Sequence, residues 1–240
     1  MSTLLFVLLL SFACFLQGIA GFGFAILATP ITFLFLEKQT AVLSIMVVSI
    51  VLNLFLFLKI KSRVDYKTVL TIFIASLTGM PIGIYILQQS SVNTLKIFIG
   101  VVVLAFTIAK SIKKSDLPKN PLTSIIIGIV SGIMNTSVGM SGPAIVVYLS
   151  RKADDVDLIR KNMSTIFLIM PIVSLFFMYQ SHILTFDRVS NGLYSAPFVI
   201  LSGYLGDRFA KKVSRNLFEK LTLAIVVFAS IYCIYSGLFS

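Results

Sequence analysis

The sequence predicts an all-α integral membrane protein made of two pseudo-symmetric halves, and three observations indicate this class. Of its 240 residues, 58% are hydrophobic and only 12% are charged, about half the charged fraction of a typical soluble domain. The mean hydropathy is +1.01. The apolar residues gather in long runs separated by short polar segments. This composition excludes both an ordinary soluble domain and a disordered chain.

Eight apolar stretches cover most of the chain. They run over residues 3–36, 40–58, 68–88, 94–109, 122–150, 163–181, 189–206 and 217–239. A helix needs about 20 apolar residues to cross a bilayer, so six of the eight stretches are of single-span length. The apolar run at 4–10 has no Lys or Arg before it, which favours an uncleaved membrane segment over a signal peptide.

The first and fifth stretches are longer than one span, and each is interrupted by glycine and small polar residues. The interruptions lie at residues 17–30 and 131–143, and both end in proline. Glycine lets a backbone leave helical geometry, and proline suits the first turn of a helix. Each long stretch is therefore expected to form two helical pieces joined by a break, with helices that restart near Pro30 and Pro143.

The order of motifs indicates an internal duplication. A Leu-(Thr/Ser)-Gly motif ends at Gly79, 49 residues after Pro30, and again at Gly203, 60 residues after Pro143. The charged segment 151–161 accounts for the difference of 11 residues. The chain is therefore expected to be a single membrane domain over 1–240, with one repeat half at 1–115 and the other at 120–240.

The positions of the basic residues predict how the halves face each other. Of the 20 Lys and Arg residues, 17 lie in four clusters, at 59–67, 110–119, 151–161 and 208–220. If both broken stretches enter and leave the membrane on one side, as re-entrant hairpins, all four clusters fall on the cytoplasmic side. Each half then has three transmembrane helices, so the halves form an inverted repeat with both termini on the opposite side. Eight full spans, in a 4+4 repeat, are the alternative.

The two breaks are candidates for an anion site. Non-helical backbone at membrane depth must be buried in protein or line a cavity, and a helix N-terminus there favours a negative charge. No charged residue lies in the middle of a predicted span, so amides and hydroxyls must hold a polar ligand. The substrate-binding candidates are the polar and glycine residues of the two breaks: Gln17, Gly21, Gly23, Thr29, Asn135, Thr136, Ser137, Gly139, Ser141 and Gly142.

Other small and polar residues are interpreted as structural. Gly79, Gly83, Gly203 and Gly206 have no supporting polar neighbours and are expected at helix packing positions. Asn53 and Tyr148 lie in apolar surroundings, where they would bond across helices or line the transport path, and the structural role is favoured.

Three motifs resemble a known family. Gly21-Phe22-Gly23-Phe24 followed by Pro30, Gly139-Met140-Ser141-Gly142-Pro143, and the basic tail at 203–214 are similar to those of the sulfite exporter TauE/SafE family, also called the toluenesulfonate uptake permeases. The resemblance covers nearly the whole chain. It implies a bacterial or archaeal inner-membrane carrier for sulfur-containing anions or small organic acids, driven by an ion gradient.

Two other functions compete with the carrier. Gly139-Met140-Ser141-Gly142 fits the GxSG pattern of an intramembrane serine protease, with His182 as the candidate base. His182 is expected at the end of its span as a solvated residue, which disfavours this hypothesis. An anion channel is the second competitor, and saturable uptake would distinguish the carrier from it.

The expected partners follow from the same composition. The basic clusters lie between apolar stretches, which indicates membrane topology and no nucleic-acid partner. Cys14 and Cys233 offer neither a disulfide framework nor a metal site, and we expect no metal and no cofactor. The expected partners are a small anionic substrate, membrane lipid and a coupling ion, either H+ or Na+. The oligomeric state is not predicted, and a homodimer is one option.

Overall fold

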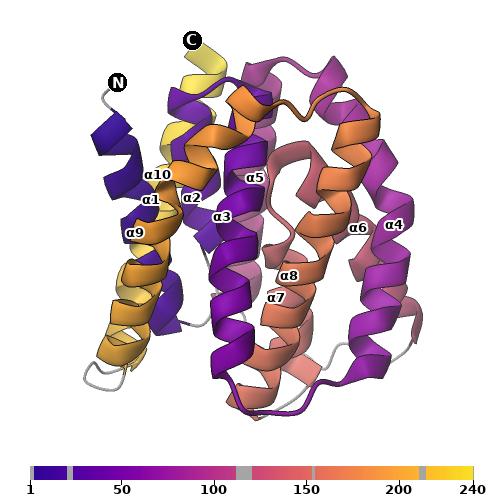
Figure 1. The fold of residues 1–240 in the computed structure, drawn as a ribbon, viewed down its shortest axis with the longest axis vertical. Helices are drawn as coiled ribbons and strands as arrows, with labels where there is room; N and C mark the ends of the chain where they lie inside the picture. The colour runs from indigo at the N-terminus through magenta and orange to yellow at the C-terminus, as the bar shows by residue number, and fades with distance from the viewer. Residues whose placement is uncertain (1–2, 21–23, 112–120, 153–154, 211–214, 240) are drawn as a thin grey trace.

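A computed structural model describes residues 3–20, 24–111, 121–152, 155–210 and 215–239, which form ten α-helices and no strand (Figure 1). The helices are α1 (Thr3–Ala20), α2 (Phe24–Phe35), α3 (Lys38–Lys59), α4 (Tyr66–Gln89), α5 (Val92–Ser111), α6 (Pro121–Val138), α7 (Gly142–Lys152), α8 (Val156–Gln180), α9 (Phe186–Ala210) and α10 (Arg215–Phe239). The predicted all-α class is confirmed.

Six of these helices are long and run roughly along one bundle axis. Among the described residues, α3, α4 and α8 are long and apolar enough to cross a membrane by length and composition alone. Helices α5, α9 and α10, of 20, 25 and 25 residues, lie beside them in the bundle (Figure 1). In α9, Ser195 and Gly192 are buried, and Gly192 contacts Ser44 and Val47 of α3, so the polar face of α9 is turned toward protein.

The two interrupted stretches each form a pair of helices. Helix α1 ends at Ala20 and α2 begins at Phe24, whereas α6 ends at Val138 and α7 begins at Gly142. Helices α2 and α7 have 12 and 11 residues. At about 1.5 Å per residue they reach about 18 Å, too short for a hydrocarbon core of about 30 Å. Each short helix contacts the longer helix of its own pair.

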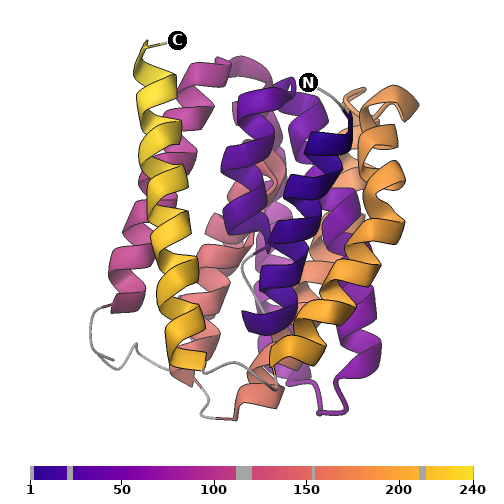
Figure 2. The same ribbon diagram turned by 90° about the vertical axis from the view of Figure 1, so that its left-hand side faces the viewer.

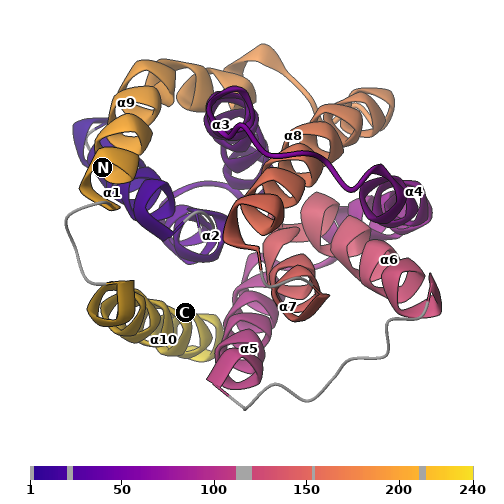
Figure 3. The same ribbon diagram turned by 90° about the horizontal axis from the view of Figure 1, so that it is seen from below.

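The two pairs open toward opposite ends of the bundle. The start of α1 and the end of α2 lie at the end where both chain termini are seen (Figures 1 and 2). The start of α6 and the end of α7 lie at the other end. Viewed along the axis, α2 and α7 lie near the centre of the bundle (Figure 3). The starts of α2 and α7 therefore lie inside the bundle.

The position of Pro30 corrects one expectation. A helix was expected to restart near Pro30, but α2 already begins at Phe24 and Pro30 lies inside it. The apolar residues that follow the glycines support helix from Phe24 onward, and a proline in the second turn removes one hydrogen bond without ending the helix. Pro143, in contrast, lies in the first turn of α7, where its missing N–H costs nothing.

Two helix junctions at one end of the bundle carry many of the described basic residues. The junctions of α3 with α4 and of α7 with α8 lie at the end opposite the chain termini (Figure 1). They carry eight of the basic residues: Lys59, Lys61, Arg63, Lys67, Arg151, Lys152, Arg160 and Lys161. The clusters at 110–119 and 208–220 fall largely or in part outside the described residues. We call this the basic end of the bundle.

Glycines allow the closest helix contacts. A Cβ atom at Gly79 would lie 2.2 Å from the Ile129 carbonyl oxygen, and one at Gly83 would lie 2.3 Å from the Ile133 carbonyl oxygen, both on α6. A Cβ at Gly206 would lie 2.2 Å from the Phe15 carbonyl oxygen of α1. A Cβ at Gly203 would lie 2.6 Å from the Cδ1 atom of Leu52 on α3. The prediction that Gly79, Gly83, Gly203 and Gly206 are packing positions is confirmed.

Candidate functional site

One cavity lies where the two helix breaks meet. It is lined by residues of both breaks and by the middle of α3 and α8: Gln17, Phe24, Ala25, Ile26, Ser49, Asn53, Gly139, Ser141, Gly142, Val146 and Phe167. Its empty space, including the opening, is about 340 Å³, of which about 20 Å³ is open to the centre of a water-sized molecule. One water needs about 10–15 Å³ by that measure, so the cavity suits a solute of only a few heavy atoms.

Gln17 holds the first break together. Its side chain is 3% exposed, and its Oε1 accepts a hydrogen bond of 2.8 Å from the backbone N–H of Phe24. Phe24 is the first residue of α2, so Gln17 satisfies one of the amides that a helix start leaves without a partner. The Gln17 Nε2 atom donates to Asn53 Oδ1 at 3.3 Å. The end of α1 is thereby connected to the start of α2 and to α3.

Asn53 and Ser49 extend this connection across the cavity. Asn53 Nδ2 donates to the Ser49 carbonyl oxygen at 2.8 Å and to Ser49 Oγ at 3.1 Å. Ser49 Oγ in turn donates to the Phe167 carbonyl oxygen of α8 at 3.4 Å. A buried polar side chain is stable only when it is hydrogen-bonded, and Asn53 at 2% exposure meets that requirement. One chain of polar contacts therefore links α1, α2, α3 and α8 around the cavity.

Gly139 ends the first arm of the second break. Its φ of +74° is in the left-handed region, which glycine adopts without strain. Its N–H donates to the Asn135 carbonyl oxygen at 3.0 Å, the pattern of a helix that ends in a left-handed residue. A Cβ at this position would also lie 3.3 Å from Ile45. Met140 and Ser141 follow, and α7 begins at Gly142.

The N-termini of α2 and α7 both face this cavity. The first N–H groups of a helix have no partner within it and carry about half a positive charge. Three residues in the first turns of these helices line the cavity: Ala25 and Ile26 of α2 and Gly142 of α7. Pro143, the next residue of α7, has no N–H to offer. Two helix starts are thus directed at one small space, an arrangement that favours an anion.

The predicted site residues separate into three groups. Gln17, Gly139, Ser141 and Gly142 line the cavity. Gly21 and Gly23 lie outside the described residues. Thr29, Asn135, Thr136 and Ser137 are buried in helices and are not among the lining residues.

Two residues of the third group pack helices together. Asn135 Nδ2 donates to Ser174 Oγ of α8 at 2.6 Å, and Thr136 Oγ1 donates to the Met80 carbonyl oxygen of α4 at 2.8 Å. Thr29 and Ser137 have side-chain oxygens that are buried and form no hydrogen bond in the described residues.

A comparison with protein families identifies this architecture. The model of the family described as sulfite exporter TauE/SafE matches residues 6–233, nearly the whole chain. The chain belongs to the sulfite exporter TauE/SafE family. Comparisons with curated proteins and with solved structures give no match. TauE/SafE proteins are membrane transporters, so this chain is a multi-pass membrane transporter and not an enzyme.

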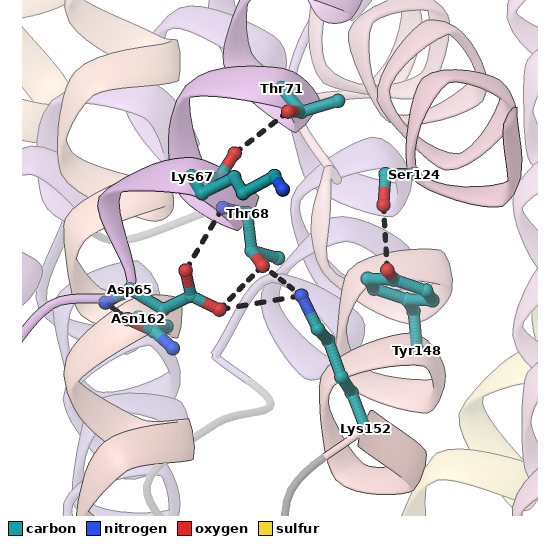
Figure 4. A network of polar contacts seen from close by, with 8 residues as sticks. All are labelled: Asp65, Lys67, Thr68, Thr71, Ser124, Tyr148, Lys152 and Asn162. Carbon is teal, nitrogen blue, oxygen red and sulfur yellow. Dashed lines mark hydrogen bonds and ion pairs between the residues drawn. The ribbon is translucent and has the colours of Figure 1, made fainter. Parts of the chain in front are cut away.

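Sequence reasoning missed several cavity residues of this TauE/SafE protein. Ser49, Phe24 and Phe167 line the cavity and were not among the candidates. Asn53 was assigned a structural role, yet it both bonds across helices and lines the cavity. The sequence signal that could have indicated this cavity role is an asparagine in the apolar stretch 40–58, one helical turn after Ser49. Tyr148 has the expected structural role, because its hydroxyl lies 2.6 Å from Ser124 Oγ of α6 (Figure 4).

Polar contacts at the basic end hold the far end of α7. Lys152, in its last turn, lies 3.3 Å from Asp65 Oδ2 and also bonds to Thr68 Oγ1 (Figure 4). Asp65 begins α4 by accepting the Thr68 N–H at 3.1 Å, and its own N–H donates to Asn162 Oδ1 of α8 at 2.9 Å. We call these four residues, Asp65, Thr68, Lys152 and Asn162, the α7 anchor.

The α7 anchor changes the ionisation of Asp65. Partial burial on its own would raise the pKa of Asp65, but the hydrogen bonds from Thr68 and the positive charge of Lys152 outweigh it. The pKa of Asp65 is therefore lowered from its ordinary value of 3.8, and the carboxylate stays charged at neutral pH. Two more ion pairs at this end, from Lys59 and Arg160 to Asp207, connect α3, α8 and α9.

The protease alternative has no support in the site. Ser141 lines the cavity, whereas His182 is exposed in the segment between α8 and α9 and does not line it. A nucleophilic serine needs a base within hydrogen-bond reach.

Within the described ranges, no cluster of three or more His, Cys, Asp and Glu side chains could hold a metal ion, and Cys14 and Cys233 are free and buried.

Proposed function

We propose that this TauE/SafE protein is a secondary transporter that binds a sulfite-sized anion in the cavity where its two helix breaks meet. The observation that carries the proposal is the single cavity lined by Gln17, Phe24, Ser141 and Gly142, because these residues come from breaks more than 110 residues apart in the sequence. The starts of α2 and α7 supply a positive pole from both sides.

The charge balance of the cavity supports an anionic ligand. None of the described lining side chains is charged, so no carboxylate opposes an anion there. The two buried lysines bond elsewhere: Lys96 Nζ donates to Ser236 Oγ at 3.0 Å, and Lys161 Nζ donates to the Ile60 carbonyl oxygen at 3.0 Å. The anion is therefore held by backbone N–H groups, the Ser141 hydroxyl and the second Nε2 proton of Gln17. Neutral donors of this kind bind an oxyanion and still release it.

The size of the cavity supports a small oxyanion within the substrate class. A space of about 20 Å³ for water-sized centres holds only one or two water molecules, which favours the smallest anions of the substrate class, such as sulfite with four heavy atoms. Taurine or an aromatic sulfonate carries further heavy atoms beyond the sulfur-oxygen group. The family description as sulfite exporters agrees with this choice.

The arrangement of the helices supports alternating access. Residues 1–115 and 120–240 would be inverted halves, each with one broken hairpin and three crossings: α3, α4 and α5 in the first, α8, α9 and α10 in the second. The α1–α2 pair opens toward one end and the α6–α7 pair toward the other (Figure 2). Rocking one half against the other around the shared cavity would expose it to each side in turn. The basic end is assigned to the cytoplasm of a bacterial or archaeal inner membrane.

The decisive experiment measures uptake of ³⁵S-sulfite by purified protein in proteoliposomes, with thiosulfate, taurine, sulfoacetate and acetate as competitors. Saturable sulfite uptake is expected. Ser141→Ala should raise the KM for sulfite by about tenfold, the value of one hydrogen bond to a charged ligand. Ser150→Ala, on α7 but outside the cavity, is the control and should transport normally. Uptake that fails to saturate would indicate a channel, and equal transport by both variants would remove Ser141 from the site.

A further inference from the structure

Resting on the proposed function, we infer that Phe167 sets the upper size limit of the transported anion and that Gly142 forms the opposite wall. Under this inference the wild-type cavity takes an inorganic sulfur oxyanion or a sulfonate whose organic group is no larger than methyl. A larger organic group on the sulfur atom is excluded by the Phe167 ring.

The geometry of the two residues supports this assignment. A Cβ atom at Gly142 would lie 3.7 Å from Cζ of Phe167, an ordinary van der Waals contact. The gap between the start of α7 and the tip of the ring is therefore about one methyl group wide. Phe167 is 7% exposed and lines the cavity, so its ring contributes to the wall. The gap therefore has room for a methyl group beside an anion bound at the start of α7, and the Phe167 ring closes it to larger groups.

The backbone of Phe167 is fixed, which makes the ring a defined wall. Phe167 lies in the middle of α8, and its carbonyl oxygen accepts a hydrogen bond from Ser49 Oγ of α3. Phe24, the other aromatic residue of the cavity, begins α2, and its N–H bonds to Gln17. A change at Phe24 would alter the helix start that binds the anion, whereas a change at Phe167 alters only the space. Phe167 is therefore the residue at which size selectivity can be separated from binding.

The experiment widens and narrows the same gap. Uptake of ³⁵S-sulfite into proteoliposomes is measured with methanesulfonate, propanesulfonate and benzenesulfonate as competitors. In Phe167→Ala, the inhibition constants of propanesulfonate and benzenesulfonate should fall by at least about tenfold relative to wild type. In Gly142→Ala, the added methyl fills the gap, so the inhibition constant of methanesulfonate should rise relative to the KM for sulfite. The double variant should return toward the wild-type profile. Phe177→Ala, on α8 and outside the cavity, is the matched control.

The outcomes separate this inference from the proposed function. An unchanged competitor profile in Phe167→Ala, with sulfite transport intact, overturns the size limit and leaves the sulfite site in place. A wild-type protein that transports no anion overturns the proposed function itself. If Phe167→Ala fails to fold, Gly142→Ala decides: a rise in the ratio of the methanesulfonate inhibition constant to the sulfite KM supports the inference, and an unchanged ratio contradicts it.

Discussion

Gln17 is the cavity residue that connects the start of α2 with α3 at the first break. It accepts the N–H that starts α2 and donates to Asn53 on α3, so a single neutral side chain positions a helix start and adds a hydrogen-bond donor to the cavity. An amide can do both because it has an acceptor and a donor end. The site therefore depends on the neutrality of this side chain as well as on its shape.

Gln17→Glu tests the electrostatic part of this role. The carboxylate can still accept the Phe24 N–H, but it places a negative charge beside the anion. Two like charges 4 Å apart repel by about 4 kcal/mol at an effective dielectric of about 20. The KM for sulfite should therefore rise by at least about tenfold, whereas Gln17→Met should lower stability and raise the KM less. Gln180→Glu adds the same charge at an exposed position and should leave uptake unchanged. Full activity in Gln17→Glu would contradict an anion at this cavity.

At the residue scale, sequence could predict the breaks but not every side chain that faces them. Gln17, Ser141 and Gly142 could be predicted as site residues from the sequence, because they lie within the two interruptions. Ser49 and Phe167 lie on unbroken helices, where the face that meets the cavity depends on packing. Lipid and protein interior are both apolar, so a membrane helix carries little periodicity to reveal its inner face. Thr29 does not line the cavity, because α2 starts one and a half turns before it.

At the scale of elements, the glycine and proline signals had different predictive value. Gly139 adopts a positive φ that ends α6, and Pro143 lies in the first turn of α7, as the sequence patterns predicted. Pro30 gave the wrong start for α2, because a proline is compatible with the first turn but does not require it. The ends of the short helices also depend on contacts that no local pattern contains, such as the bond from Lys152 to Asp65.

The α7 anchor predicts a measurable pH dependence of stability. The pKa of Asp65 is lowered in the folded protein, so its stabilising effect is present above the ordinary pKa of 3.8 and is lost as pH falls through the lowered value. The ion pair is about one-third exposed, so its contribution is about 1 kcal/mol or less. Asp65→Asn keeps a helix-capping side chain and removes the charge.

Thermal unfolding in detergent checks this prediction. Asp65→Asn should lower the Tm by about 2–4 °C at pH 7, and the difference from wild type should vanish as pH falls below 3.8. Asp155→Asn is the matched control: Asp155 also caps a helix start, by accepting the N–H groups of Asp157 and Leu158. A Tm difference for Asp65→Asn that persists unchanged at low pH would show that the anchor does not act through the charge of Asp65.

For the whole molecule, charge placement supplied the information that hydropathy lacked. Eight apolar stretches fit either eight spans or six spans with two hairpins, because stretches of 34 and 29 residues can do either. The positive-inside rule favoured the hairpins, since only that arrangement gathers the basic clusters. In the structure, α2 and α7 are too short to span, and the described basic residues at the α3–α4 and α7–α8 junctions share one end. The relation between the two halves remains a proposal that labelling can test.

Single cysteines placed at Lys61, Asp157 and Ser91 distinguish the two topologies. All three side chains are exposed, and the native Cys14 and Cys233 are buried. Because the hairpin arrangement puts the α3–α4 and α7–α8 junctions at one end, Lys61→Cys and Asp157→Cys should react with a membrane-impermeant maleimide from the same face. Ser91→Cys, at the α4–α5 junction, should react from the other face. Eight full spans would place Lys61 and Asp157 on opposite faces. That outcome would also contradict the shared cavity. If the two broken stretches cross the membrane and do not return as hairpins, the starts of α2 and α7 cannot both be directed into one cavity.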